Sequence, residues 1–113
     1  MKIIDTKISI NKLKKMANKM FGNLVKAVVD IEKEVVAIDG ELHSDEEALL
    51  LEKGSKQENL WGINIYPEIK GDDWVEFDSI INLRPSLKNL SRGVDNPEIR
   101  KKIIKILNKL IIK

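Results

Sequence analysis

The spacing of apolar residues changes along this chain, and that change constrains the fold more than any other feature. Over residues 9–21 and again over residues 97–110, apolar side chains recur every three or four positions, as they do on one face of an α-helix. Residues 25–31 instead place apolar side chains at every second position, which is the period of a half-buried strand. A chain with helical spacing near both ends and strand spacing between them is expected to combine helices with a sheet.

Short local signals set the boundaries of these elements. Gly22 is expected to end the first helix, because glycine accepts the left-handed conformation that follows a helix. Ser44 and Glu47 have the spacing of a capping box and predict a helix start, and Pro97 suits the first position of the last helix. The elements expected in chain order are a helix at 9–21, strands at 25–31 and 35–42, a helix from 44 to Gly54, strands at 60–66 and 74–83, and a helix from 97 onward.

This order predicts an α+β fold built as one domain over residues 1–113. Two hairpins joined by a short helix are expected to make one antiparallel sheet of about four strands, with the helices packed on one face. A chain of 113 residues is long enough to bury most of the surface that its unfolded form exposes.

The composition excludes several classes of protein. The chain has no cysteine, which excludes disulfides and thiolate metal sites and favours a reducing compartment, so the cytoplasm is the expected location. Asp5 and Lys7 interrupt the apolar start of the chain, so no signal peptide is predicted. No apolar run approaches the length of a membrane span, and no membrane association is expected.

The net charge of +2 conceals an uneven distribution. Residues 1–22 sum to +5 and residues 84–113 to +7, whereas residues 23–54 and 55–83 sum to −6 and −4. The favoured interpretation is that the terminal helices carry lysine on their solvated sides. The alternative is a basic surface for phosphate or nucleic acid, which would make the protein an interaction module for protein or RNA through the outer faces of the two terminal helices.

The first polar segment, residues 39–47, holds the only histidine of the chain. On an extended strand Asp39, Glu41 and His43 would project from one face. With Asp45 they could bind a metal or supply acid–base groups, and Glu41, His43 and Asp45 are the secondary polar candidates. One histidine is too few for a two-histidine iron site, so no metal ligand is assigned. The favoured interpretation is structural, because carboxylates at a helix start interact well with the positive end of the helix dipole.

The second polar segment, residues 84–93, holds two of the three arginines. Arginine presents a planar fork of donors that suits phosphate or carboxylate, and hydroxyl and amide donors lie beside it in this segment. The predicted anion-binding residues are Arg84, Ser86, Asn89, Ser91 and Arg92. An equally weighted alternative has Arg84 paired with Asp78 or Glu76, while the serines and the asparagine shape turns.

Two tryptophans, Trp61 and Trp74, lie in predicted strands. They could stack on nucleic-acid bases if one sheet face were open, but Glu76 and Asp78 on that face would repel phosphate. Core packing is therefore the favoured role for both tryptophans.

Four blocks of the chain, residues 25–32, 38–51, 58–67 and 81–99, resemble a small family of uncharacterised proteins of about this length, known only as a domain of unknown function. The resemblance covers nearly the whole chain. It implies no activity, cofactor or functional residue.

The function predicted from the sequence is the binding of an anionic, phosphate-bearing ligand at residues 84–92, with enzymatic activity and any cofactor left open. If residues 39–47 lay beside this loop, Glu41, His43 and Asp45 would add polar groups to the site. Two alternatives stand beside this prediction: a protein or RNA interaction module, and a homo-oligomeric structural protein whose open sheet face is covered by a second copy.

Overall fold

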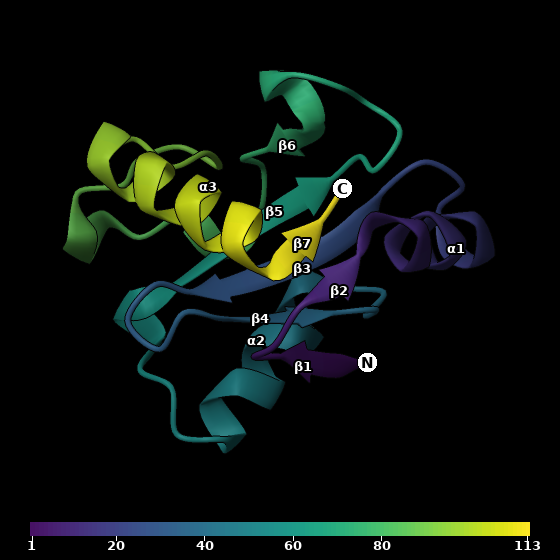
Figure 1. Cartoon of the computed structure of the whole chain (residues 1–113). Helices are drawn as coiled ribbons and strands as arrows, with labels where there is room; N and C mark the ends of the chain where they lie inside the picture. The colour runs from purple at the N-terminus through teal and green to yellow at the C-terminus, as the bar shows by residue number, and fades with distance from the viewer.

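A five-stranded antiparallel sheet forms the centre of the computed structural model, which describes all 113 residues (Figure 1). The strands lie in the order β1 (Lys2–Ile4), β4 (Val35–Ile38), β3 (Val25–Asp30), β5 (Leu60–Ile65) and β6 (Val75–Glu76). The middle strand β3 pairs with β4 on one side and β5 on the other, where Val29 lies opposite Val36 and Trp61.

Three helices flank the sheet, namely α1 (Ile10–Met20), α2 (His43–Glu52) and α3 (Pro97–Leu110). The side chain of Ser9 caps α1 by accepting a hydrogen bond from the backbone N–H of Lys12, and Asn96 caps α3 in the same way. A small parallel pair of strands, β2 (Ile8–Ser9) and β7 (Ile111–Ile112), ties the start of α1 to the end of α3. None of the helices is long and apolar enough to cross a membrane.

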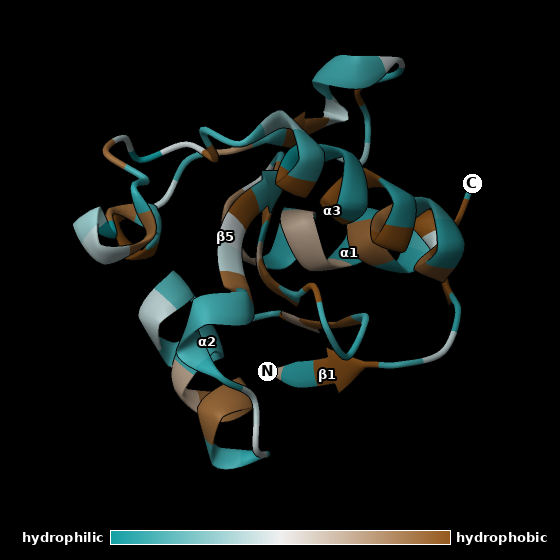
Figure 2. Ribbon diagram, turned by 90° about the vertical axis from the view of Figure 1, so that its left-hand side faces the viewer, coloured by the Kyte–Doolittle hydropathy of each residue, from teal (hydrophilic) through white to brown (hydrophobic).

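The helices cover both faces of the sheet. Figure 2 shows α1 and α3 on one side of β5 and α2 on the other. The face under α1 and α3 carries the main core of 20 buried residues, which includes Leu13 of α1, Leu107 of α3 and Val29 of β3. The face under α2 carries a second cluster of four buried residues: Val28, Ala37, Leu50 and Leu60.

The α+β class with an antiparallel sheet is confirmed, and two details differ from the prediction. The sheet has five strands because β1 adds an edge strand of three residues, which is too short to show an alternating pattern. The helices do not all lie on one face, since α2 packs on the face opposite α1 and α3. The physical reason is that Val28 and Val29 of β3 point to opposite faces and are both fully buried, so both faces need a cover.

The strand predicted at residues 74–83 is confined to β6. Further along the edge of β5, the side chain of Asn82 takes the place of a paired strand. Asn82, at the end of the short 3-10 turn η3 (Ile80–Asn82), accepts from the N–H of Gly62 at 2.8 Å and donates to the carbonyl of Gly62 at 2.9 Å. Glycine is required at position 62, because a Cβ there would lie 2.6 Å from the Cβ of Ser79. Beyond η3 the chain forms the loop that carries residues 84–92.

Candidate functional site

The two polar segments singled out in the sequence meet in space. Arg84 Nη2 lies 3.1 Å from Glu47 Oε2, and the two side chains are only 10% and 13% exposed. The guanidinium of Arg84 also lies 5.2 Å from the ring centroid of Trp61. Burial lowers the pKa of Arg84, while the charge of Glu47 opposes that shift. The alternative partners predicted for Arg84, Asp78 and Glu76, are therefore wrong.

Most polar groups of the 84–92 loop hold the loop itself together. Asn89 is buried, and its amide donates to the backbone carbonyls of Asn82, Ser91 and Gly93. The Ser91 hydroxyl donates to Asp95, and this hydrogen bond is the main cause that lowers the pKa of Asp95.

Arg92, the second arginine of the loop, is also paired within the protein. The Arg92 Nε donates to Asp78 Oδ1 at 2.7 Å, although the arginine is about half exposed. Ser86 is exposed and makes no hydrogen bond to the protein. An anion site at Arg84, Ser86, Asn89, Ser91 and Arg92 stays a prediction. Contacts within the protein already use most of the hydrogen-bond donors of these five residues.

The first polar segment does not place its candidates on one face. β4 ends at Ile38, and Asp39 has a φ of 66°, so the chain turns before Glu41 instead of continuing as a strand. Glu41 and Asp45 are exposed, whereas His43 is buried at the start of α2. No group of three or more histidine, aspartate or glutamate side chains in the structure is placed to hold a metal ion.

His43 is held as a neutral base. Its Nε2 lies 2.7 Å from the backbone carbonyl oxygen of Ile63, and because a carbonyl only accepts, Nε2 carries the proton. Burial lowers the pKa of His43, outweighing the opposite effect of this hydrogen bond. The charged groups that act on the ring are Lys26, Asp78 and Arg92.

Glu46 is a buried acid that the sequence did not reveal. Its side chain is fully buried, and Oε2 accepts a hydrogen bond from the N–H of Gly40 at 3.0 Å. Burial raises the pKa of Glu46 to about 9, so the side chain is neutral at pH 7. Nothing in the sequence separates Glu46 from its neighbours in the same acidic run.

A groove of about 580 Å³ lies elsewhere, between α3 and the segment formed by the short turn η2 (Asp72–Trp74) and β6. Its α3 wall is basic and presents Arg100, Lys101 and Lys105. Their spacing along the helix keeps all three on one side of α3. The volume lies within the usual range of ligand-binding pockets.

The remainder of the groove is apolar and has a single carboxylate. Trp74, Phe77 and Ile104 contribute its apolar lining, and Asp72 comes from the segment that faces α3. Lys113 lies at the same end as Trp74, with its Nζ 3.7 Å from the centroid of the ring. Trp74 itself is only 4% exposed and belongs to the core, so the accessible apolar surface of the groove comes from Phe77 and Ile104. The groove thus combines basic side chains, this apolar surface and one acid on the wall opposite the helix.

The basic side chains of the groove are only weakly engaged by the protein. The Nη1 of Arg100 donates to the backbone carbonyls of Val94 and Asp95, which fixes the arginine while its other donors are free. Lys101 pairs with Glu98 at 3.5 Å, but both side chains are about three-quarters exposed, so the pair is weak. Lys105 has no ionic partner.

Sequence reasoning placed Lys101 and Lys105 on the outer face of the last helix but did not find the groove. The sequence feature that could have indicated this groove is Arg100, the third arginine of a chain that otherwise uses lysine. Which segment lies opposite that helix face is decided by tertiary contacts alone.

Comparison with other proteins places the chain in a family but gives it no function. No curated protein and no solved structure matches it. One family model, described as Protein of unknown function (DUF5674), matches residues 2–110 of the 113 residues. The chain therefore belongs to this family of proteins of unknown function, as the resemblance predicted.

Proposed function

We propose that this protein binds an anionic ligand with a flat apolar part, such as a phosphate-bearing nucleotide, in the groove between α3 and β6. The observation that carries the proposal is the distribution of chemistry across the groove. Three cations, Arg100, Lys101 and Lys105, line one wall, and Asp72 lies on the other.

A phosphate-bearing ligand satisfies each of these groups. The guanidinium of Arg100 and the two lysines suit phosphate oxygens, since charge-assisted hydrogen bonds to cations are the strongest type available. Phe77 and Ile104 offer apolar contact to a ring. Asp72 can accept a hydrogen bond from an amino group on that ring. The proposal keeps the ligand class predicted from the sequence and moves the site from the loop to the helix.

The space beneath the 84–92 loop is a less suitable location for an anion. It encloses about 250 Å³, and its charged lining residues are Lys88, Glu58 and Asp95. Two acids and one lysine disfavour a phosphate there. The outer side of the loop, where Arg92 is half exposed, is the alternative location for the same ligand.

A thermal-shift titration with inorganic phosphate, AMP and ATP tests the proposal. A ligand present at about a hundred times its dissociation constant stabilises the native state by about 2.7 kcal/mol. We expect a nucleotide to raise the midpoint of wild type and to lose most of that effect in Lys101→Gln/Lys105→Gln.

The matched control is Lys12→Gln/Lys15→Gln, which removes the same charge from exposed positions of α1. This variant should keep the shift given by the mononucleotide. A shift that disappears instead in Arg92→Gln would move the site to the loop, and the absence of a shift with every phosphate compound would refute the proposal.

A further inference from the structure

The segment at residues 80–92 exposes several large apolar side chains. Leu90 is 72% exposed and Ile80 67%, the two highest values among the large hydrophobic residues of the protein, and Leu83 is 46% exposed. Single apolar residues scattered over a surface are ordinary, but a group of them in one short segment marks an interaction surface. Figure 1 shows this segment in green at the left end of the molecule, away from both termini.

The backbone of the loop explains why two of these leucines point outward. Arg84 and Asn89 pair as residues of a hairpin do, since each N–H donates to the carbonyl of the other residue, at 2.9 Å and 3.1 Å. Paired residues point to the same face, and both side chains are held inside the protein, Arg84 by Glu47 and Asn89 by backbone carbonyls. Leu83 directly precedes Arg84 and Leu90 directly follows Asn89, so their side chains point to the outer face.

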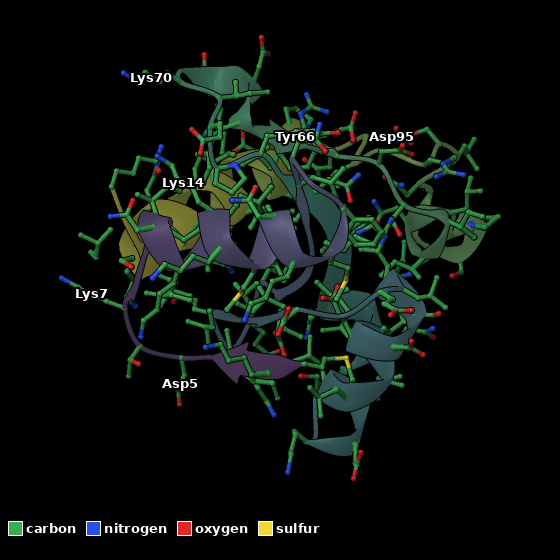
Figure 3. The ribbon with its side chains drawn as sticks, turned by 90° about the vertical axis from the view of Figure 1, so that its right-hand side faces the viewer. Asp5, Lys7, Lys14, Tyr66, Lys70 and Asp95 are labelled. Carbon is green, nitrogen blue, oxygen red and sulfur yellow. The ribbon has the colours of Figure 1, made fainter.

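Ile80 lies on the same outer surface. The N–H of Leu83 donates to the carbonyl of Ile80 at 3.1 Å, which closes the 3-10 turn η3. Side chains three positions apart lie one above the other in such a turn, so Ile80 and Leu83 are on the same side. Ile80, Leu83 and Leu90 together form what we call the loop patch. Figure 3, in which Asp95 is labelled near the loop, shows the loop on the side of the molecule away from Lys7.

Polar contacts behind the loop patch hold it in a fixed shape. The amide of Asn82 donates to the carbonyl of Arg92 at 2.9 Å, and the amide of Asn89 donates to that of Gly93 at 2.8 Å. The N–H of Leu90 donates to the carboxylate of Asp95 at 2.9 Å. An apolar surface that is already ordered loses little conformational entropy when a partner covers it.

Most charges around the loop patch are matched within the protein. Arg84 pairs with Glu47, and Arg92 pairs with Asp78. Lys88, at the tip of the loop, is the one charged side chain of residues 80–92 without an ionic partner. A surface with so little unmatched charge offers little to a charged partner and repels an identical copy only weakly.

We infer that a second copy of this chain covers the loop patch, so that the protein forms a twofold dimer through residues 80–92. In a twofold contact both copies use the same surface, and aliphatic side chains surrounded by matched charges are complementary to themselves. Helices cover both faces of the sheet, so the loop takes the place of the open sheet face as the surface for self-association. This inference is independent of the groove, whose lining includes none of the three residues of the loop patch.

Other occupants fit the loop patch less well. Residues 80–92 contain no aromatic residue and one unpaired lysine, whereas segments that bind lipid surfaces combine aromatic residues with several basic ones. None of the three apolar side chains lines the groove or the space beneath the loop, so the patch lacks the concave shape that a small molecule requires. A second copy needs neither feature.

Sedimentation velocity from about 1 to about 200 µM protein tests this inference. A contact centred on three aliphatic side chains belongs to the small interfaces, so we expect a dissociation constant of about 10–100 µM. Leu83→Gln/Leu90→Gln should weaken the dimer about tenfold or more. The matched control Leu51→Gln/Ile69→Gln, which changes exposed apolar residues elsewhere, should leave the dimer unchanged. All four positions are exposed, so both variants should fold as the wild type does.

A cysteine cross-link gives an independent readout, because the chain has no cysteine of its own. A short bismaleimide should join two copies of Leu90→Cys, whose residue 90 lies in the contact, and should not join two copies of Ile69→Cys.

A wild type that stays monomeric at the highest concentration overturns the inference, and so does a dimer that Leu83→Gln/Leu90→Gln leaves intact. If a monomeric protein instead binds phosphatidylcholine vesicles and loses that binding in Leu83→Gln/Leu90→Gln, a lipid surface is the occupant and the second copy is refuted. Each of these results leaves nucleotide binding in the groove to its own test.

Discussion

The two faces of the sheet are stabilised in different ways. Under α1 and α3 the core comprises 20 buried residues, all of them hydrophobic. Under α2 the apolar cluster has only four residues, and three polar side chains on that side, His43, Glu46 and Asn82, are buried with it.

The outer sides of the two layers also carry opposite charge. α1 and α3 together carry Lys12, Lys14, Lys15, Lys19, Arg100, Lys101, Lys102, Lys105 and Lys109 against the single acid Glu98. α2 exposes the acids Asp45 and Glu52 and contains no lysine or arginine.

This comparison shows where the protein can tolerate change. A layer held by apolar burial keeps its stability when the charges on its outer side change, so that side is free to specialise in binding. A layer held partly by buried ionisable groups changes its stability with pH, because those groups must stay neutral.

The largest effect on stability is expected when one buried leucine is replaced on each face of the sheet. Leu107 and Leu50 are suitable because both are at most 1% exposed. Leu107→Ala should lower the free energy of unfolding by about 3–5 kcal/mol, because the cavity lies inside a large packed core. Leu50→Ala should cost about 2–3 kcal/mol, since a cluster of four residues can collapse around the gap.

Urea denaturation of both variants measures this difference. An equal or larger loss for Leu50→Ala would show that the α2 face is as tightly packed as the other and would remove the distinction between the two faces.

A smaller effect is expected from Glu46→Gln, which imitates the protonated acid. The pKa of Glu46 is raised from 4.5 to about 9 on folding, so its contribution is complete below pH 4.5 and is lost as the pH rises toward 9. Between pH 5 and pH 8 the wild type should lose about 3–4 kcal/mol of stability that the variant keeps.

Denaturation curves at pH 5 and pH 8 test this, with Glu52→Gln as a control from the exposed part of the same helix. Curves for wild type and Glu46→Gln that shift in parallel with pH would contradict a protonated buried acid.

The smallest effect is expected for His43→Gln, and its pH dependence has the opposite direction. Burial lowers the pKa of His43 from 6.5, so the unfolded chain takes up the proton first and the wild type loses stability as the pH falls below 6.5. Glutamine can still donate to the carbonyl of Ile63, and this variant should show a flatter acid limb. A thermal melt series from pH 7.5 to pH 5 provides the measurement, and an unchanged acid limb would argue against a buried neutral histidine.

Several elements could be predicted from the sequence because their signals are local. The alternating residues of β3, the glycine at Gly22 with a φ of 91°, and Pro97 at the first position of α3 all act within one or two turns of chain. The strand predicted up to Leu42 ends at Ile38 because Asp39 adopts a left-handed backbone. The Asp39-Gly40 pair is a turn signal that the prediction of a continuous strand did not use.

The candidate site was predictable only as a collection of residue types. The sequence showed that arginines cluster near residues 84–92 and that lysines line the last helix. It could not show that Arg84 is engaged by Glu47, because 37 residues separate them and no spacing rule links their positions.

The sequence by itself determined that this protein is an α+β domain with basic helices at both ends, because periodicity and end signals depend on neighbours along the chain. Only the tertiary structure decided that α2 covers the opposite face and that Asn82 completes the edge of β5. It also decided that the basic side of α3 faces Asp72 and Phe77 across a groove. These arrangements depend on contacts between distant segments, and their free energy is gained only once the chain has folded.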